Sequence, residues 1–406
     1  MKLKDKKICI LGLGYIGLPT AAILANENYN VNGVDIDKDV VNNINLGNTH
    51  FSEKDLDKLL GVAINKKKFK ALEAPVESDI YIICVPTPFI YNNEVPEPDI
   101  QFINSAVDSI TNLLKPEDII ILESTSPVGT TLAIRDKLEK KNINLENIYI
   151  AYCPERVLPG CTLEELVNND RVVGGINDLS TNKVADFYET FVRGQVQRTN
   201  SKTAEMCKLI ENSYRDVNIA FANEVSIICE KNNIDVWKLI KLANHHPRVN
   251  VLQPGCGVGG HCIAVDPWFI ISQNFEQSKL IKAAREVNNY KPKWAINKII
   301  KLIDTSKNKK NSKVVCFGAT FKPNIDDVRE SPAIEIVSSL LYRGFDVCVS
   351  DPNIRSYKDL KILDINKAID LGEIFIFLVK HNEFLEESFK KKFANKKVLD
   401  LCGVFS

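Results

Sequence analysis

Residues 255–267, with the sequence GCGVGGHCIAVDP, place a thiol, an imidazole and a carboxylate beside a run of glycines. Four glycines stand within the first six positions, and we expect a loop here because ordering glycine costs the most backbone entropy. Such a loop suits a place where the backbone approaches a ligand closely. It would present Cys262 as a nucleophile, with His261 beside it and Asp266 four residues further on. Taken alone, the segment is equally typical of a glycine-rich turn with a buried cysteine.

A second set of reactive side chains falls on a segment with helical spacing. Residues 195–254 contain no glycine, and apolar residues recur at helical intervals from Thr203 to Lys231, which predicts one long helix. Glu205, Lys208 and Asn212 share one side of this helix because they are three and four residues apart. A surface Glu–Lys pair is the simplest interpretation of the first two. It explains Asn212 less well, since asparagine is only a moderate helix former.

The N-terminal region has the order strand, glycine motif, helix, strand. Residues 7–11 are apolar, GLGYIG follows at once, residues 18–26 are rich in Ala and Leu, and residues 29–35 end in an acid. This order predicts a dinucleotide-binding unit, in which the glycines allow a tight turn and the helix N-terminus faces the phosphates. Asp35 would bind the ribose hydroxyls and repel a 2′-phosphate, which favours NAD over NADP. The residues expected at NAD are Gly12, Gly14, Tyr15, Ile16, Gly17 and Asp35.

Three further predicted strands in this half end in polar or proline-rich segments. Residues 79–85 precede PTP, residues 118–122 precede ESTSPVGTT, and residues 148–151 precede a segment that begins CPERVLPG at Cys153. Ligands bind outside the carboxyl ends of the strands of an open parallel sheet, so each segment is a candidate for ligand contact. Glu155, which follows a proline at such a strand end, is the best carboxylate candidate in this half.

The remainder of the chain predicts two further regions. Helical spacing continues at residues 236–243, 279–289 and 293–302, and a charged linker follows. A second α/β unit begins at residue 314 and lacks a G-x-G-x-x-G motif, so it is expected to bind something other than a second dinucleotide. We therefore predict an α/β protein with two Rossmann-like, doubly wound domains joined by a helical domain. The predicted boundaries are 1–198 for NAD binding, 199–305 for the helical and dimerising domain, and 306–406 for the second α/β domain.

The composition excludes several classes of protein. Lys plus Arg equals Asp plus Glu at 52 each, so no basic surface suggests nucleic acid. No apolar run reaches the roughly 18 residues of a membrane span, and the N-terminus does not resemble a signal peptide. Eleven cysteines without a secretion signal are typical of reduced thiols in a cytoplasmic protein.

Three kinds of chemistry compete for these residues. A metal site built from Cys256, His261, Cys262 and the histidines at 245 and 246 matches no zinc spacing, so no metal is expected. A simple 2-hydroxy-acid dehydrogenase would leave the Cys262 loop unexplained. A four-electron oxidation of an alcohol to an acid uses every feature, because a thiolate that adds to the intermediate aldehyde allows a second hydride to leave. A lysine would then stabilise the tetrahedral oxyanion.

The chain resembles the UDP-glucose/GDP-mannose dehydrogenase family over essentially its whole length. The segments that carry the resemblance are residues 12–19, 124–130, 152–160, 203–224, 246–267 and 321–332. The resemblance implies NAD as cofactor, a UDP-sugar as substrate, and a C-terminal domain that binds UDP.

The resemblance also implies roles for individual residues. Cys262 would be the nucleophile, with Asp266 beside it, Lys208 and Asn212 at the water and oxyanion, Glu155 as acid/base, and Thr125 at the catalytic water. Further NAD contacts would be Thr87 and Arg329. The implied substrate contacts are Arg156, Val157, Leu158, His246, Arg248, Gly259 and Lys322, with Arg248 reaching across a dimer.

Departures from the family pattern indicate the sugar. His261 and Val265 replace a serine and a lysine of the UDP-glucose enzymes, which favours a UDP-N-acetylhexosamine. The run from Arg156 to Gly160 favours N-acetylmannosamine, with the N-acetylglucosamine epimer as the alternative. Cys256 replaces an expected proline, which raises the hypothesis of an inhibitory disulfide with Cys262. A catalytically silent sensor of NAD and nucleotide sugar is a further alternative, and a homodimer or higher homo-oligomer is expected.

Overall fold

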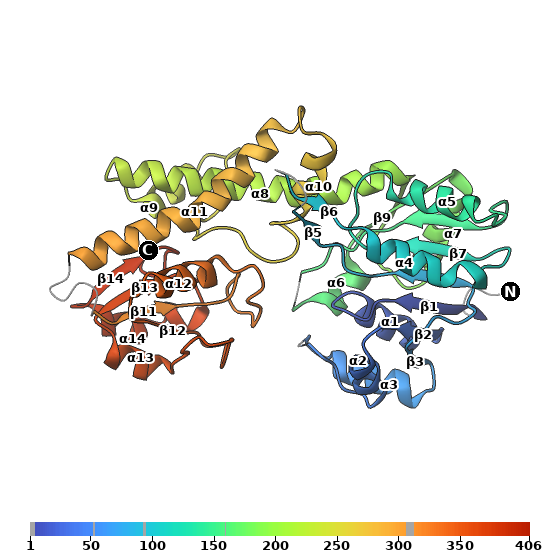
Figure 1. Cartoon of the computed structure of the whole chain (residues 1–406), viewed down its shortest axis with the longest axis horizontal. Helices are drawn as coiled ribbons and strands as arrows, with labels where there is room; N and C mark the ends of the chain where they lie inside the picture. Colours follow the sequence, from blue (N-terminus) through green and yellow to red (C-terminus); the bar gives the residue numbers. More distant parts are fainter. Residues whose placement is uncertain (1–4, 52, 92–94, 159, 306–311) are drawn as a thin grey trace. The chain divides into compact units, whose positions relative to one another are not determined.

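The computed structural model describes residues 5–51, 53–91, 95–158, 160–305 and 312–406. The chain forms two compact units, of which the first runs to Ile210 and includes Trp268–Gln273, and the second comprises Glu211–Pro267 and Asn274–Ser406. Helix α8 (Ser201–Lys231) spans the boundary between them in the sequence (Figure 1). The predicted fold class, two Rossmann-like sheets with a helical region between them in the sequence, is confirmed. The predicted three-domain boundaries stay a prediction.

The first unit is built on an eight-stranded sheet with the order β10-β9-β8-β7-β4-β1-β2-β3. Its strands are β1 (Lys7–Leu11), β2 (Asn30–Val34), β3 (Phe69–Leu72), β4 (Ile80–Ile83), β7 (Ile119–Leu122), β8 (Tyr149–Tyr152), β9 (Arg171–Gly175) and β10 (Val196–Asn200). The six strands from β8 to β3 run parallel, in the order of a dinucleotide-binding fold. Only β9, with its parallel neighbour β10, runs against β8. The order of strands reverses between β1 and β4, where such folds bind their ligand.

Alternate residues of these strands enter two separate cores. Ile8 and Ile10 face one core, and Cys9 and Leu11 face the other, as the two-residue period of a strand requires. The helices of this unit are α1 (Gly17–Asn26), α2 (Lys38–Asn45), α3 (Leu56–Asn65), α4 (Gln101–Ile110), α5 (Thr130–Lys140), α6 (Thr162–Asn168) and α7 (Asp178–Tyr188). Side chains of α1, α3 and α7 fill the first core, and those of α4 and α5 fill the second. A short hairpin of β5 (Phe89–Ile90) and β6 (Glu97–Pro98) follows β4.

The second unit carries a four-stranded parallel sheet with the order β12-β11-β13-β14. Its strands are β11 (Val314–Phe317), β12 (Val347–Ser350), β13 (Ile374–Phe377) and β14 (Lys397–Asp400). Its helices include α9 (Val236–Ala243), α11 (Lys279–Asp304), α12 (Pro332–Tyr342), α13 (Ile365–Leu371) and α14 (Glu387–Lys390), while most of α10 (Asp266–Gln273) belongs to the first unit. Side chains of α11 and α12 cover one face of the sheet. A cluster of phenylalanines that includes Phe317, Phe377 and Phe384 covers the other.

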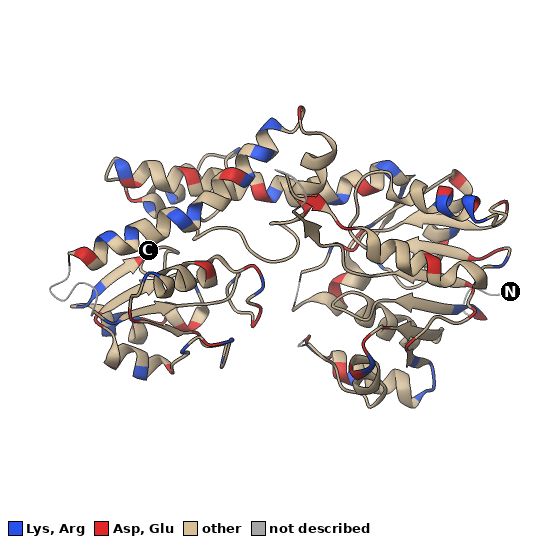
Figure 2. Ribbon diagram, viewed as in Figure 1, with Lys and Arg blue, Asp and Glu red and all other residues tan. Residues whose placement is uncertain are grey.

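Charged residues of both signs are interspersed over each unit, as the equal numbers in the sequence lead one to expect (Figure 2). Within the described ranges, no helix combines the length and the apolar character that crossing a membrane requires.

We expect Gly17→Ala to destabilise the first unit, although alanine is ordinarily the better helix residue. A Cβ at Gly17 would lie 1.9 Å from the carbonyl oxygen of Gly12 and 3.2 Å from Cβ of Cys84. Overpacking of this kind costs about 1–3 kcal/mol. Gly14→Ala is the matched control, because a Cβ there would meet no atom within 4 Å. Urea unfolding should show a lower midpoint for Gly17→Ala alone, and equal midpoints for the two variants would contradict this.

Candidate active site

The glycine motif of the first unit forms the tight turn that its sequence predicts. Gly12 has a φ of +93°, and a Cβ on it would lie 2.7 Å from the carbonyl oxygen of Cys84. The space beside Gly14 is open. Helix α1 begins at Gly17, and the preceding residue, Ile16, has no side-chain acceptor to cap the first amides. These residues fit a bound dinucleotide, because uncapped amides at a helix N-terminus attract phosphate.

Asp35 lies at the end of β2, against the glycine turn. Its carboxylate accepts a hydrogen bond from the Leu13 amide at 3.0 Å and one from the Asp37 amide at 3.0 Å. The side chain is thereby fixed beside the motif, which is compatible with the predicted contact to ribose.

Sequence reasoning missed an aromatic group next to the same turn. The rings of Tyr15 and Phe51 lie 4.4 Å apart, and the ring of His50 lies 4.9 Å from that of Phe51. Burial lowers the pKa of the His50 imidazole, while Asp35 acts in the opposite direction. No sequence motif identifies His50 or Phe51. Only their position in the fold, next to Tyr15, identifies them.

Three predicted residues follow neighbouring parallel strands and therefore meet at one edge of the sheet. Thr87 follows β4, Thr125 follows β7 and Glu155 follows β8, and these strands are adjacent in that order. Ser124 Oγ donates to the Val85 carbonyl at 2.7 Å, which ties two of these segments together. The predicted convergence of the strand ends is thus observed.

The interpretation of Glu205 as one half of a surface ion pair is wrong. The Glu205 side chain is fully buried. It accepts hydrogen bonds from the Gly129 amide at 2.6 Å, the Thr131 amide at 2.7 Å and Thr131 Oγ1 at 2.6 Å. It therefore caps the N-terminus of α5 from another helix, because the first turn of a helix lacks acceptors of its own. Burial raises the pKa of this carboxyl despite these bonds.

Lys208, one turn further along α8, is buried and contacts the segment that follows β8. Its Nζ donates to the main-chain carbonyl of Glu155 at 2.7 Å. The Glu155 carboxylate is partly buried and accepts a hydrogen bond from the Val157 amide. Loss of hydration raises the pKa of Glu155 to about 7, with Lys208 and Arg171 acting in the opposite direction. A carboxyl with this pKa can both take and give a proton near neutral pH.

The segment after this glutamate carries the other predicted substrate contacts of the first unit. The carbonyl of Arg156 accepts from Asn169 Nδ2 at 3.3 Å, and the amide of Leu158 donates to the Glu165 carboxylate at 2.7 Å. The Leu158 side chain is half exposed. Pro159 lies outside the described residues.

In the second unit, Cys262 is exposed at the end of the glycine loop. Its carbonyl accepts from the Val265 amide at 3.1 Å and from the Asp266 amide at 2.8 Å. Asp266 begins α10, is buried, and accepts from Asn212 Nδ2 at 2.5 Å. The structure therefore brings three of the predicted catalytic residues together around one short turn. The alternative of a buried cysteine in a turn is excluded for Cys262.

The glycines of this loop allow it to approach other parts of its own chain closely. A Cβ at Gly259 would lie 2.3 Å from the Glu330 carbonyl oxygen, and one at Gly260 would lie 2.8 Å from the Phe321 ring. Gly257 and Gly260 have φ of +143° and +80°. The loop thus packs closely against residues 321–330 of its own chain. Glycine is required there whether or not Gly259 also contacts the substrate as predicted.

The position of Cys256 argues against a disulfide with Cys262. Its side chain is buried in the core of the second sheet, where Sγ donates to the Leu378 carbonyl at 3.5 Å. Burial raises the pKa of its thiol to about 12. A thiol that stays protonated reacts poorly with another sulfur. Within the described residues, no group of three or more His, Cys, Asp or Glu side chains is arranged to hold a metal ion.

Lys322 lies in a loop that a buried histidine organises. Thr320 Oγ1 donates to the Lys322 carbonyl at 2.8 Å and lies 3.3 Å from His381 Nε2. The same Nε2 lies 3.1 Å from the Asp351 carboxylate, and Nδ1 accepts from the Asn324 amide at 3.0 Å. His381 and Asp351 were not found from the sequence, since a lone histidine after a strand has no distinctive spacing.

Two other groups of predicted ligand contacts lie in the second unit. The Arg329 guanidinium pairs with the Asp327 carboxylate at 2.6 Å. The main-chain carbonyl of Arg329 accepts from the Gly260 amide at 3.2 Å. His246 and Arg248 follow α9 and are exposed, and the Arg248 amide donates to His246 Nδ1 at 3.3 Å.

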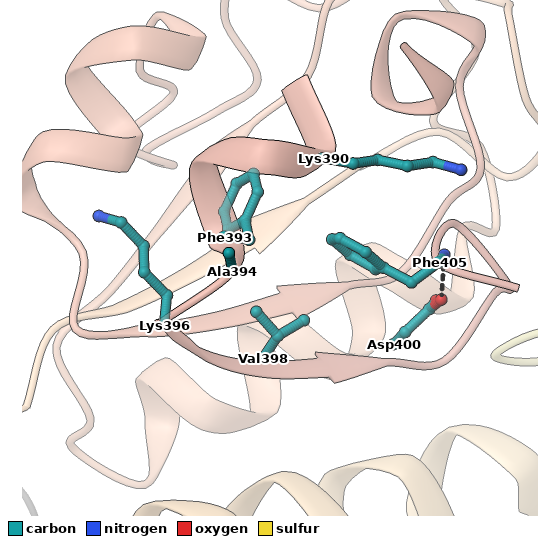
Figure 3. A pocket seen from close by; sticks show the side chains of 7 residues that line it. All are labelled: Lys390, Phe393, Ala394, Lys396, Val398, Asp400 and Phe405. Carbon is teal, nitrogen blue, oxygen red and sulfur yellow. Dashed lines mark hydrogen bonds between the residues drawn. The ribbon is translucent and has the colours of Figure 1, made fainter. Parts of the chain in front are cut away.

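The predicted catalytic residues therefore form two sets, Thr125, Glu155 and Lys208 in the first unit and Asn212, Cys262 and Asp266 in the second. Neither set contributes to the surface pocket at the edge strand β14. That pocket is lined by Lys390, Phe393, Ala394, Lys396, Val398, Asp400 and Phe405 (Figure 3). A second pocket beside β2 and β3 contains none of the predicted residues either.

Comparison with known proteins matches three segments of the chain to one family. Residues 6–192 match the NAD binding domain of the UDP-glucose/GDP-mannose dehydrogenase family, residues 202–290 its central domain, and residues 315–406 its UDP binding domain.

Individual relatives match over nearly the full length. The UDP-N-acetyl-D-mannosamine dehydrogenase of Campylobacter jejuni is 48% identical, over 98% of this chain and 99% of the relative. The NDP-N-acetyl-D-galactosaminuronic acid dehydrogenase of Ralstonia nicotianae is 43% identical, over 99% and 96%. The solved structure of the UDP-D-ManNAc dehydrogenase from Pyrococcus horikoshii superimposes with a TM-score of 0.91 at 33% identity, covering 98% of this chain and 96% of that one. The chain therefore belongs to the UDP-glucose/GDP-mannose dehydrogenase family.

Proposed function

We propose that the protein is an NAD-dependent dehydrogenase that oxidises C6 of UDP-N-acetyl-D-mannosamine from an alcohol to a carboxylate. The full-length similarity to a UDP-N-acetyl-D-mannosamine dehydrogenase supports this substrate. The observation that carries the chemistry is the exposed Cys262, whose carbonyl accepts from the amide of Asp266, the residue that Asn212 holds by a hydrogen bond. A non-catalytic sensor would not require an exposed thiol in that position.

The proposed reaction consists of two successive oxidations followed by a hydrolysis. Gly12, Gly14, Gly17 and Asp35 would hold NAD, which supplies the hydride acceptor for each of the two oxidations. After the first oxidation, the Cys262 sulfur adds to the C6 aldehyde and forms a thiohemiacetal. The second oxidation converts this adduct to a thioester on the same sulfur, and water then releases the carboxylate and restores the thiol.

Proton transfer and charge stabilisation fall to the groups around Glu155 and Asp266. Ionised Glu155 takes a proton from the attacking water, for which its pKa of about 7 is suited. The positive charge of Lys208, held beside Glu155, stabilises the negative oxygen of the tetrahedral intermediate. Asn212 fixes the Asp266 carboxylate next to the turn that carries the nucleophile.

Substrate choice is tested by NADH formation with four UDP-sugars. We expect UDP-N-acetylmannosamine to give the highest kcat/KM and to yield two NADH per sugar. The similarity to an NDP-N-acetyl-D-galactosaminuronic acid dehydrogenase makes UDP-N-acetylgalactosamine a necessary competitor, together with UDP-N-acetylglucosamine and UDP-glucose. A higher kcat/KM for another sugar would reassign the substrate, and no NADH with any of them would favour a sensor.

Cys262→Ala should abolish formation of the acid while nucleotide-sugar binding is retained. Without the sulfur no thioester can form, so the loss should be at least about 10²–10³-fold in kcat, as for other essential catalytic groups. Calorimetric titration with UDP-N-acetylmannosamine should give a Kd within a few-fold of the native value. Cys161→Ala is the control, since Cys161 is another exposed cysteine. Normal acid formation by Cys262→Ala would eliminate the covalent step.

We also propose that two copies associate through α8. Tyr214, Phe221 and Ile228 are exposed by 70%, 58% and 52%, and their spacing of seven residues places them on one side of the helix. Exposed apolar stripes of this kind mark protein interfaces.

Phe221→Asp should therefore shift the protein from dimer to monomer in analytical ultracentrifugation, because a carboxylate cannot be buried unpaired. Tyr342→Asp is the control, because Tyr342 is 94% exposed on α12. A dimer of unchanged stability in Phe221→Asp would place the interface elsewhere.

Location in the cytoplasm stays a prediction, supported by eleven cysteines that are all described and form no disulfide.

A further inference from the structure

A buried arginine holds the segment that contains Glu155. Arg171, the first residue of β9, is only 2% exposed. Its Nη1 donates to the carbonyl of Pro154 at 3.5 Å, and its Nη2 donates to the carbonyl of Leu166 at 3.2 Å. Pro154 directly precedes Glu155, and Leu166 lies on α6, beyond the segment. The guanidinium thus bridges the two ends of the segment that carries the predicted acid/base residue.

A buried carboxylate is linked to the same arginine through Tyr188. Glu123 follows β7 and is 3% exposed. It accepts from the hydroxyl of Tyr188 at 2.5 Å and from Cys84 Sγ at 3.2 Å. The Arg171 guanidinium lies 5.5 Å from the centre of the Tyr188 ring.

The protonation of this group follows from its burial. Burial raises the pKa of the Tyr188 hydroxyl and of the Cys84 thiol well above their ordinary values, so both keep their protons and donate. Glu123 is then the acceptor in both bonds. Buried charges persist in proteins when opposite charges and hydrogen bonds compensate them. Arg171 and Glu123 thus both lie at Tyr188, Arg171 near its ring and Glu123 at its hydroxyl, and Arg171 also holds the segment that carries Glu155.

We propose that Arg171 and Glu123 are positioning residues of opposite effect, which together set the pH range in which Glu155 can act as a base. This inference rests on the proposed role of Glu155 in thioester hydrolysis. Arg171 favours the ionised form of Glu155 and also fixes the carbonyl before it, while Glu123 opposes ionisation. An arginine with a purely structural role would hold the segment in place without changing the pH range over which Glu155 ionises.

The other charged groups around Glu155 do not remove this effect. Lys208 of α8 lowers the pKa of Glu155 as Arg171 does, and Glu165 of α6 raises it as Glu123 does. Loss of hydration is the largest influence and brings the pKa to about 7. Because the base must be ionised, the rate should fall as the pH drops below about 7. This fall is the acid limb of the pH profile. Substitution of one charged, buried neighbour of Glu155 should move the acid limb along the pH axis.

The test compares kcat against pH for Arg171→Gln and Glu123→Gln in the full-length protein, with saturating NAD and UDP-N-acetylmannosamine. Removing a nearby charge changes a pKa by about 1 unit or more. We expect the acid limb to move to higher pH in Arg171→Gln and to lower pH in Glu123→Gln. Arg171→Lys keeps the charge, so its limb should stay near the native position while kcat falls through loss of the two-carbonyl bridge.

Arg198→Gln is the control, since Arg198 lies on the neighbouring β10 but pairs at the surface with Glu189 and Asp186. Its limb should not move. Shifts in the same direction, or no shift, in the Arg171→Gln and Glu123→Gln variants would overturn the inference. If circular dichroism shows that Arg171→Gln is unfolded, the test rests on Glu123→Gln. An acid limb at the native pH in Glu123→Gln then overturns the proposal.

Glu155→Gln separates this inference from the function on which it rests. Loss of the acid limb and of most of the turnover in Glu155→Gln is expected if Glu155 is the base. A native limb in that variant would remove the proposed role of Glu155 itself. A limb that disappears in Glu155→Gln but stays fixed in the two charge variants would refute only the role of Arg171 and Glu123.

Discussion

The burial of one carboxylate, that of Glu205, sets the position of the helix on which the candidate site depends. With no exposure and three hydrogen bonds from the start of α5, this side chain joins α8 to the first sheet. Hydrogen bonds to a charged group contribute about 1.5–3 kcal/mol each, and leaving such a group unsatisfied costs more. Once Glu205 is fixed, the helical spacing also places Lys208, whose Nζ donates to the Glu155 carbonyl within the same unit.

A second buried polar group sets the register between α8 and α11. Asp216 accepts from Arg285 at 2.7 Å and from Asn288 at 2.8 Å, and Asn288 in turn accepts from Asn223 at 2.9 Å. The Asn223 side chain also accepts from the Gly255 amide at 2.9 Å, which fixes the first residue of the glycine loop. Apolar helix faces can slide by a turn at little cost, whereas these directional bonds are satisfied in one register only. The nucleophile loop therefore starts from a fixed point.

Patterns that depend on neighbours in the sequence could be predicted, and those that depend on packing could not. The dinucleotide unit and the polar strand ends follow from strand and helix periods, and the fold places Gly12, Asp35 and Glu155 after the strands that these periods predict. For Glu205, the helical period shows which residues share a side but not which side is buried.

The glycine loop and the buried residues Arg171 and Glu123 illustrate the same limit. Sequence indicates that the backbone approaches something near Gly259, but only the fold identifies Glu330 and Phe321. Arg171 and Glu123 occupy strand ends, where a charged residue alone predicts an exposed position. The antiparallel return of β9 along β8 brings Arg171 to the segment that follows β8, and no local pattern encodes this pairing.

Burial also distinguishes one thiol among many. Cys84, Cys153 and Cys256 are partly or fully enclosed, and loss of hydration raises the pKa of each, to about 12 for the last two. Such thiols stay protonated at neutral pH and behave as small apolar side chains. Cys262 instead reaches solvent at the end of a loop whose base is fixed by Asn223. The same loss of hydration that keeps Glu155 partly protonated therefore keeps these three thiols protonated, whereas Cys262 remains exposed in the turn that leads to Asp266.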